Sequence, residues 1–504
     1  MKNHAQRLRV CCLVLLSSLA LSTLASAQLA GTYSVGAGGS YPDMSAAIAA
    51  LNTQGVLGPV TFNVTGNQTG PWTISSFTGQ GPSNPVIFEG GGTVALSGTN
   101  PILTMSGCSY VTMSGFTASF PSGEGFVITG STSLSGFIGC NFTTPPTTSG
   151  ATNRIFTFSG GTGCYVQDSE FGGGYEAFNL TGGNTLTMER CRILSGGFWI
   201  AQIAAPDFTF KNNFVYGNAN YGFRAGVGSN NLRVYNNSFS ITHAGSVGQG
   251  CSLRWYTSEY SEVINNAFQN INSAGAGHIM WCSGSFRPTV MDNNCYNLQN
   301  GISLMSSGGN QTLATWQALG FDLASIEADP LYVNIAATPP DLHLSTASPC
   351  SQAGQTLASV LDDIDGAPRV PNYDIGAHEA TAANFFSAVT SGNGDLTMSL
   401  TMISSGATRG FTLLSFNTAL PVGAGPFFGI YPDANTWSVF TMPQFPGNPF
   451  HFPVGPPSVY PDIPLYVLPG TLANLIGQSC DAMSVLLDGS NLLLGRSNIV
   501  RINW

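Results

Sequence analysis

The sequence predicts an all-β protein whose main part is a right-handed parallel β-helix, with an N-terminal capping helix and a small C-terminal β-sandwich. The first observation is a recurring phrase in which apolar residues precede a polar pair and a large closing residue, as in 209–215 and 233–239. The phrase closes at residues 142, 171, 193, 214, 239, 268 and 296, in steps of 21 to 29 positions. A period in that range is typical of stacked repeats. The second observation is the composition, since only 8% of residues are charged and 62 are glycine, as in a turn-rich β structure.

Residues 1–27 have the pattern of a secretory signal. Lys2 and Arg7 give a basic start, an apolar run follows, and Ala25 and Ala27 form a small-residue cleavage site. The apolar run is shorter than the ~20 residues that cross a bilayer as a helix. We therefore expect a mature chain that is secreted or held at the cell surface, without a transmembrane segment.

The formal charge of −10 is unevenly distributed. Between residues 154 and 254 basic residues outnumber acidic ones by seven to five, whereas nine acidic residues and only Arg369 lie between 322 and 379. An acidic protein of this kind is not expected to bind nucleic acid.

Several cysteines occupy repeat positions that hold Asn or Ser elsewhere, which is typical of small buried residues. After loss of the signal their number is odd, so they do not all pair within one chain. Cys251 and Cys282 lie in neighbouring repeats, and export would permit a disulfide between them. This is the pair that the sequence singles out for a test.

The best helix candidate covers residues 41–51. It is alanine-rich, with Met44, Ile48 and Leu51 on one face and Asp43 as an N-cap. The first coil of a repeat stack has an open edge that would otherwise pair with other chains. We expect this helix to cover that edge.

The stack itself is expected from about residue 59 to residue 307. Each coil should hold the strand of the recurring phrase and a second strand that opens with Gly or a charged residue, as in 154–158 and 222–225. Alternation along each strand places one residue in the core and the next in solvent. The side chains two positions before each closing residue form one column, and we expect them to point inwards and to hydrogen-bond to one another along the stack. Its members are Cys140, Ser169, Cys191, Asn212, Asn237, Asn266 and Asn294.

Residues 316–379 end the stack with an ordered string of motifs. These are Asp-Pro-Leu-Tyr-Val at 329–333, a Ser-Pro and Ala-Gly turn within 348–354, and Asp-Ile-Gly-Ala-His-Glu at 374–379. The string resembles the C-terminal coils of secreted bacterial right-handed β-helix proteins of the pectin lyase-like superfamily, in which a Tyr usually stands at the position of His378. The resemblance covers about residues 41–380 and concerns the framework rather than an active site.

Residues 381–504 have a different character. The repeats stop, Pro and aromatic residues are frequent, and short apolar runs such as 395–402 and 410–416 are separated by Gly and Pro. About 120 residues of this kind predict a small β-sandwich. The expected division is therefore a signal at 1–27, a capped β-helix at 28–380 and a C-terminal module at 381–504.

The resemblance implies chemistry on acidic polysaccharides. Lyases of that superfamily hold Ca²⁺ with clustered carboxylates and use Arg or Lys as the base, and hydrolases there use facing Asp pairs. The sequence shows neither arrangement, so the catalytic residues are unassigned; if the protein is an enzyme, it is expected to be a polysaccharide lyase or glycoside hydrolase. Residues 362–366 offer oxygen ligands for Ca²⁺ but are interpreted as a turn. His243, His278 and His343 are interpreted as isolated, so no metal site and no cofactor is predicted.

The candidate binding residues form a basic band that also carries Trp. The repeat alignment places them on neighbouring coils, ~4.8 Å apart, on one exposed face. They are Arg190, Arg192, Trp199, Lys211, Arg224, Arg254 and Trp281. Such a face can pair Arg with carboxylated sugars and stack sugar rings on Trp. The alternative is a set of ordinary surface ion pairs, such as Asp168 with Arg190. Lys211 and Arg224 have the fewest obvious partners and are the preferred candidates.

Two functional hypotheses follow. In the first, the exported β-helix binds, or binds and cleaves, an acidic extracellular polysaccharide or cell-surface glycan. In the second, it is a non-enzymatic structural or adhesion protein of the cell surface, with the stack as a rigid spacer and the C-terminal module as the attachment point. The basic band favours the first, and the missing catalytic arrangement favours the second.

Overall fold

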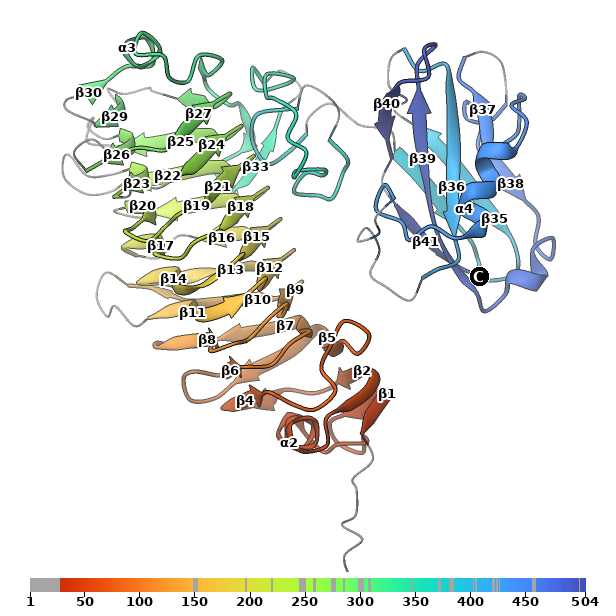
Figure 1. The fold of residues 1–504 in the computed structure, drawn as a ribbon, viewed down its shortest axis with the longest axis horizontal. Coiled ribbons are helices and arrows are strands. Elements are labelled where there is room, and N and C mark those ends of the chain that lie inside the picture. Colours follow the sequence, from red (N-terminus) through yellow and green to blue (C-terminus); the bar gives the residue numbers. More distant parts are fainter. Residues whose placement is uncertain are drawn as a thin grey trace, which may run out of the picture.

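The structure is a computed structural model, and Figure 1 shows its fold. It describes residues 28–147, 153–194, 197–218, 221–243, 251–256, 260–272, 278–283, 286–297, 303–306, 310–345, 348–369, 373–379, 385–401, 403, 406–418, 422, 425, 427–455, 459–497 and 499–504. The predicted signal at 1–27 lies outside these residues. The chain forms a parallel β-helix, capped at its N-terminal end and followed by a separate group of antiparallel strands.

The N-terminal cap is the predicted helix. Helix α2 (Met44–Gln54) begins after Asp43, whose side chain accepts a hydrogen bond from the Ala46 N–H at 2.8 Å. Its buried face contains Met44, Ile48 and Leu51, as the sequence indicated. Strand β1 (Leu29–Val35) completes the end of the stack by pairing in parallel with β2 (Val56–Val64). Figure 1 shows α2 lying across the end of the solenoid.

Each coil contributes strands to three columns. The first column holds the strands of the recurring phrase: β2, β5 (Val86–Ser97), β7 (Val111–Ser119), β9 (Gly136–Ile138), β12 (Tyr165–Gln167), β15 (Thr187–Glu189), β18 (Thr209–Lys211), β21 (Leu232–Tyr235), β24 (Ser261–Ile264) and β27 (Val290–Asp292). The second column follows a turn: β3 (Gln68–Thr69), β10 (Asn141–Pro146), β13 (Glu170–Gly174), β16 (Arg192–Leu194), β19 (Phe214–Asn218), β22 (Ser238–His243), β25 (Ala267–Asn272), β28 (Cys295–Asn297) and β31 (Ile326–Glu327).

The third column is a separate sheet, here named sheet B. Its strands are β4 (Trp72–Ser75), β6 (Leu103–Ser106), β8 (Glu124–Thr129), β11 (Arg154–Thr162), β14 (Glu176–Asn184), β17 (Trp199–Ile203), β20 (Tyr221–Ala225), β23 (Cys251–Trp255), β26 (His278–Cys282), β29 (Ser303–Ser306) and the antiparallel β30 (Asn310–Gln311). The inward residues of all three columns form one continuous core, in which like residues stack, as in Phe239 on Phe268 with ring centroids 4.8 Å apart. The predicted right-handed parallel β-helix is therefore confirmed.

The turn between the first and second columns repeats one backbone conformation. Residues with positive φ occupy the same position in successive coils: Asp168, Arg190, Asn212, Asn236, Asn265 and Asn293. Asn and Asp tolerate this left-handed region better than other residues with a side chain beyond Cβ. The residue that follows points inwards and forms the predicted ladder.

The ladder is built from side-chain amides that bridge successive coils. The Asn237 Oδ1 atom accepts hydrogen bonds from the backbone N–H and the side-chain Nδ2 of Asn213, at 3.0 and 2.9 Å. In turn, Asn266 Oδ1 accepts two bonds of 3.0 Å from Asn237. Asn294 repeats the pattern toward Asn266. All four amides are fully buried, so each hydrogen bond replaces one that water would otherwise make.

One member of the predicted ladder was assigned incorrectly. Asn213, not Asn212, occupies the inward position. The strand register pairs Val215, not Phe214, with Phe239, so counting back from Phe214 as the closing aromatic shifts the alignment by one residue. Asn212 is the left-handed residue, and its side chain faces outwards.

The segment that follows the stack folds back over the outward side of this turn. It includes α3 (Leu313–Gln317), β32 (Tyr332–Asn334) and β33 (Asp341–Leu344), and residues 348–379 form its final part, here named the cover segment. The outward Asn side chains hold the cover segment through its backbone carbonyls. The contacts are Asn212 to Asp362 at 2.7 Å, Asn236 to Asp374 at 3.2 Å, Asn265 to Gln355 at 2.8 Å and Asn293 to Ala353 at 3.0 Å.

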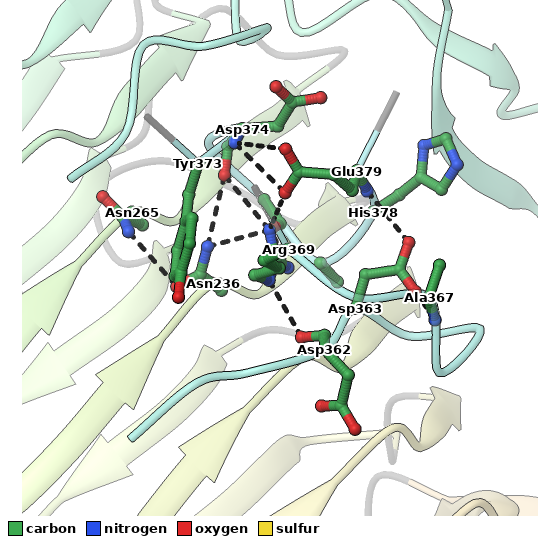
Figure 2. A network of polar contacts seen from close by, with 12 residues as sticks. Asn236, Asn265, Asp362, Asp363, Ala367, Arg369, Tyr373, Asp374, His378 and Glu379 are labelled. Carbon is green, nitrogen blue, oxygen red and sulfur yellow. Dashed lines mark hydrogen bonds and ion pairs between the residues drawn. The ribbon is translucent and has the colours of Figure 1, made fainter. Parts of the chain in front are cut away.

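Arg369 is the buried centre of the cover segment (Figure 2). Its guanidinium forms an ion pair with Glu379 at 3.0 Å and donates to the carbonyls of Asp362 and Gly376, each at 2.9 Å. It also donates to the Oδ1 atom of Asn212 at 2.9 Å, which links it to the coil beneath. A buried guanidinium requires this many acceptors, because each unsatisfied donor would cost free energy.

The C-terminal strands form two antiparallel sheets. One contains β34 (Phe385–Val389), β35 (Leu396–Thr401) and β38 (Leu465–Val467), and the other β36 (Arg409–Ser415), β37 (His451–Pro453), β39 (Ser479–Leu487), β40 (Leu493–Arg496) and β41 (Val500–Asn503). Short helical turns α4 (Ala434–Ser438), η2 (Val439–Thr441) and η3 (Ala473–Leu475) join them. Residues of both sheets, such as Met398 and Leu486, share one buried cluster, so the predicted sandwich-like arrangement is present. None of the helices in the described part of the chain has the length and apolar content needed for a membrane span.

The ladder makes a direct prediction. Asn237→Ala should lower the free energy of unfolding by about 2–4 kcal/mol, because it leaves the Asn213 donors without their buried acceptor. Urea denaturation followed by circular dichroism measures this change. Asn237→Ser is the matched variant, since Ser169 occupies the same column and accepts from the Cys140 N–H at 3.1 Å, and it should cost clearly less. A change below ~0.5 kcal/mol for Asn237→Ala would show that the ladder does not stabilise the stack.

Candidate functional site

The outward face of sheet B carries a column of polar and aromatic residues. The strand register aligns Gln202, Arg224, Arg254 and Trp281 on β17, β20, β23 and β26. Outward positions on adjacent parallel strands are ~4.8 Å apart, so these four side chains form a continuous row. Trp199, on the same face of β17, and Tyr256, just after β23, flank the row.

The two arginines of the row are held by aromatic rings. The Arg254 guanidinium carbon lies 4.5 Å from the centroid of Trp281, 4.9 Å from Tyr256 and 5.3 Å from Trp199. The Arg224 guanidinium carbon lies 4.8 Å from Tyr256 and 5.3 Å from Trp199. Cation–π contacts of this length restrain the guanidinium planes without neutralising their charge. We name these five residues, together with Gln202, the Arg–aromatic row.

Arg224 pairs with a neutral side chain. Its Nη1 atom donates to the Oε1 atom of Gln202 at 2.8 Å, a neutral amide rather than a carboxylate. Its Nε atom is buried and makes no hydrogen bond within the described residues. A guanidinium with a neutral partner keeps its full positive charge for an incoming anion.

The next coils toward the N-terminus carry an ion-pair ladder instead. Arg154 lies between two carboxylates on adjacent strands, 2.8 Å from Glu176 and 3.3 Å from Glu124. Asn179 adds a hydrogen bond of 2.8 Å to Glu176, which is only 2% exposed. Both carboxylates are therefore occupied by a cation of this chain. This ladder ends where Trp199 takes the position of Glu176 on the next strand.

Three of the predicted site residues lie elsewhere, which corrects the prediction of a single face. Arg190, Arg192 and Lys211 belong to the first two columns and to the turn between them, where the cover segment lies on them. Lys211 is 2.7 Å from Glu189 and donates to the carbonyl of Ser359 at 3.0 Å.

The two arginines beside Lys211 are also engaged. Arg190 contacts Asp168 at 2.6 Å, as the ion-pair alternative expected, and Asp362 of the cover segment at 3.0 Å. Arg192 lies over the ring of Phe214 and 3.7 Å from Asp365. The sequence could not reveal Asp362 and Asp365 as partners of Arg190 and Arg192, because they lie 172 and 173 positions away. The face formed by Arg190, Arg192 and Lys211 therefore stabilises the fold.

Sequence reasoning missed two residues of the Arg–aromatic row. Gln202 precedes Arg224 by 22 positions, one repeat, and could have been found by aligning the second strands of the coils. Tyr256 lies two positions after Arg254, beyond the end of its strand, and the repeat gives no signal for it.

A group of three potential metal ligands lies at the edge of the cover segment. Nitrogen and oxygen atoms of His343, Asp365 and His378 lie within 4.8 Å of one another, and the two rings are 4.7 Å apart. The expectation that His343 is isolated is therefore wrong. Two His and one Asp form a ligand set that zinc accepts. The hydrogen bonds at the group favour a different assignment.

His343 lies between two carboxylates. Its Nε2 atom lies 2.8 Å from the Asp365 carboxylate, and its Nδ1 atom is hydrogen-bonded to the Asp341 carboxylate. The hydrogen bond to Asp365 raises the pKa of His343, and the same bond lowers the pKa of Asp365. His378 accepts the Leu344 N–H on Nδ1 at 3.1 Å, which leaves the proton of the neutral ring on Nε2. A metal ion would have to displace protons from the rings of both His343 and His378. We therefore assign the group as an ion-pair clamp, in which His343 pairs with Asp341 and Asp365.

The clamp joins β33 to the turn at 362–366. This turn is the one expected from the sequence: the Asp363 carboxylate accepts from the backbone N–H groups of Asp365 at 2.9 Å and Ala367 at 2.8 Å. Figure 2 shows His378 pointing away from the Arg369 network, so the clamp and that network are separate.

A pocket of about 470 Å³ lies between the cover segment and the C-terminal strands. Its walls are mainly apolar, with Tyr373 on one side and Phe427 and Leu494 on the other. Its two arginines, Arg369 and Arg496, are engaged; Arg496 donates to the carbonyls of Phe428 at 2.9 Å and Leu361 at 3.2 Å. These contacts join the module to the cover segment.

The clamp should make stability depend on pH. Because the pKa of His343 is raised in the folded state, its contribution is complete below the unfolded value of about 6.5 and is lost as pH rises through the folded value. Wild-type protein should therefore lose more stability than His343→Gln between about pH 5 and about pH 9. Urea midpoints of the two proteins across this range measure the difference.

Taking the difference between the two proteins removes the effect of other groups that titrate in the same range. Glu379 is one, since burial raises its pKa to about 8. The charged and titratable groups around His343 are Asp341, Asp365, His378 and Arg192. Parallel pH profiles for wild type and variant would refute the clamp.

Comparison with known proteins agrees with this architecture. A family model described as "Right handed beta helix region" matches residues 100–279. No curated protein matches the chain. A crystal structure of pectate lyase Pel9A is similar over 71% of this chain and 98% of its own, with 14% sequence identity and a TM-score of 0.32. The central coils, including β8 to β23 of sheet B, are thus similar in sequence to the right-handed β-helix family model.

Proposed function

We propose that this protein binds an extended acidic polysaccharide along the outward face of sheet B, through Trp199, Arg224, Arg254 and Trp281. The observation that carries the proposal is the position of Arg254 among three aromatic rings. Fixing a charged guanidinium in advance lowers the entropy that binding costs. The half-buried rings of Tyr256 and Trp281 can then stack on sugars while the guanidinium pairs with their acidic groups.

The form of the row fits a polymer rather than a small ligand. Four aligned residues on four strands extend over ~14 Å, three strand spacings. The row runs across successive coils, along the direction in which the solenoid is stacked. An extended ligand can therefore contact several coils at once and gain affinity from repeated weak contacts.

The charge distribution favours an acidic ligand. The protein is acidic overall, with a formal charge of −10, yet the row contains two arginines. Arg224 donates to the neutral Gln202, whereas cations on the covered face are neutralised by residues such as Glu189 and Asp362. A local positive surface on an acidic protein attracts anions and confers selectivity over neutral chains. The resemblance to the pectin lyase-like superfamily implies the same class of ligand.

The proposal is for binding outside the cell, in keeping with the signal expected at 1–27. The carboxylates nearest to the row on sheet B, Glu124 and Glu176, are both paired with Arg154. An assay for unsaturated uronate products, with and without Ca²⁺, adds a direct test of cleavage to the binding test below.

Substitutions in the row should weaken binding. Arg254→Gln or Trp281→Ala should reduce retention on polygalacturonate or alginate by at least about fivefold, since cation–π and charged contacts of ~1–2 kcal/mol are lost. Affinity electrophoresis on gels containing each polymer measures retention. Retention should also fall with added salt, as expected for charged contacts.

Lys211→Gln is the matched control. It removes one positive charge from the neighbouring coils but from the covered face, so retention should stay at the wild-type level once circular dichroism shows that the variant is folded. The proposal would be overturned if Arg254→Gln were retained as strongly as the wild-type protein on every acidic polymer. It would also be overturned if Lys211→Gln lost as much retention as Arg254→Gln.

A further inference from the structure

We infer that Cys295 and Cys350 form a disulfide in the exported protein, which joins the cover segment to the last coils of the β-helix. Both residues are thiols in the structure, and both are fully buried. This site is independent of the Arg–aromatic row. It requires only that the chain meets an oxidising environment, which the signal expected at 1–27 would provide.

The fold brings the two cysteines together from distant positions. Cys295 begins β28 and lies opposite Ala267 of β25 and Ile326 of β31. Cys350 lies in the turn at the start of the cover segment, where its carbonyl accepts the Ile375 N–H at 2.9 Å. Cys295, Cys350, Ala267, Leu344 and Ile375 pack in one buried cluster.

The two thiols lie close enough to interact. Cys295 and Cys350 pack in one buried cluster, and the Cys350 side chain raises the pKa of Cys295 well above its usual range. The Tyr332 hydroxyl lies close to both thiols and donates to the carbonyl of Ala267 at 2.9 Å. A disulfide requires the sulfurs to approach to ~2.05 Å, a movement that side-chain rotation can supply from contact distance.

Two other buried thiols, Cys140 and Cys191, do not share this arrangement. Cys140 and Cys191 belong to the inward ladder, where Ser169 lies between them. Their sulfurs donate instead to backbone carbonyls, Cys140 to Ile138 at 3.4 Å and Cys191 to Glu189 at 3.3 Å. In that column a thiol takes the place of a Ser or Asn side chain.

The pair singled out by the sequence, Cys251 with Cys282, is excluded by strand register. Strands β23 and β26 place Cys251 opposite His278 and Cys282 opposite Trp255. The two cysteines are therefore four positions apart along the strand direction, ~13 Å. A disulfide cannot join Cα atoms more than ~7 Å apart.

The reaction is thiol–disulfide exchange with a disulfide donor, either a disulfide-bonded oxidoreductase or glutathione disulfide. The thiolate of one cysteine attacks a donor sulfur and releases one donor thiol; the other cysteine then attacks the mixed disulfide and releases the second. Two thiols are oxidised, one donor disulfide is reduced, and both protons pass to the donor. Because both thiols are buried in the folded protein, the bond should form during folding, before the cover segment packs.

The bond would close a loop from Cys295 to Cys350. It would hold the turn at the start of the cover segment, while the Arg369 network and the clamp hold its end. A crosslink of this kind stabilises by restricting the unfolded chain.

Peptide mapping of the exported full-length protein tests the inference. The protein is denatured in an alkylating reagent without reductant, digested and analysed by mass spectrometry. We expect a crosslinked peptide pair containing Cys295 and Cys350, which separates into two alkylated peptides after reduction. Alkylation of both cysteines without reduction, in exported protein and in protein refolded with glutathione disulfide, would overturn the inference.

A stability measurement gives a second readout. Reductant should lower the urea midpoint of wild-type protein but leave that of the double variant Cys295→Ser with Cys350→Ser unchanged. Cys191→Ser is the matched control and should respond to reductant as wild type does, since it removes a buried thiol of the ladder. A wild-type midpoint that does not respond to reductant would also count against the bond, and this result does not depend on the folding of the double variant.

Discussion

The pair of residues at the repeated turn is the constraint on which the rest of the structure depends. The first residue of the pair adopts the left-handed conformation and faces outwards, and the second faces inwards. In the last coils both are Asn: Asn237 joins the buried ladder, while Asn236 holds the cover segment. One dipeptide thus fixes the coil-to-coil register on the inside and the position of the cover on the outside. Because the register sets which residues align on sheet B, the Arg–aromatic row is a consequence of the same turn.

The cover segment explains why two cationic surfaces of one solenoid have different roles. Its acidic residues and carbonyls engage Arg190 and Lys211, and it is itself held by the buried Arg369. Charge on that side is therefore used for stability. Among the described residues Arg224 has no equivalent carboxylate and donates instead to the neutral amide of Gln202. Both faces carry cationic side chains, but Arg190 and Lys211 on the covered face are paired with carboxylates, whereas Arg224 on sheet B is paired with a neutral amide.

The sequence predicted the features that depend on local pattern. The period, the capping helix with Asp43, the inward ladder and the change of character after residue 380 all follow from residues close together in the chain. Features that depend on distant residues were missed or misplaced. His343 looked isolated because the fold alone brings His378 beside it. Lys211 looked unpaired because the repeat was aligned one residue off, which placed Lys211 beside Arg190 and not opposite Glu189, whose carboxylate lies 2.7 Å away. The ladder position was assigned to Asn212 and not to Asn213 because Phe214 was counted as the closing aromatic of the repeat, although Val215 is the residue in register with Phe239.

The central claim is that ligand binds to the outward face of sheet B and not to the covered face. Hydrogen–deuterium exchange of the full-length protein, with and without a saturating acidic oligosaccharide, tests it most directly. The account predicts slower amide exchange in β17, β20, β23 and β26, with unchanged exchange in the cover segment and in the C-terminal strands. Protection confined to residues 348–379 or to the C-terminal module, with sheet B unaffected, would contradict it.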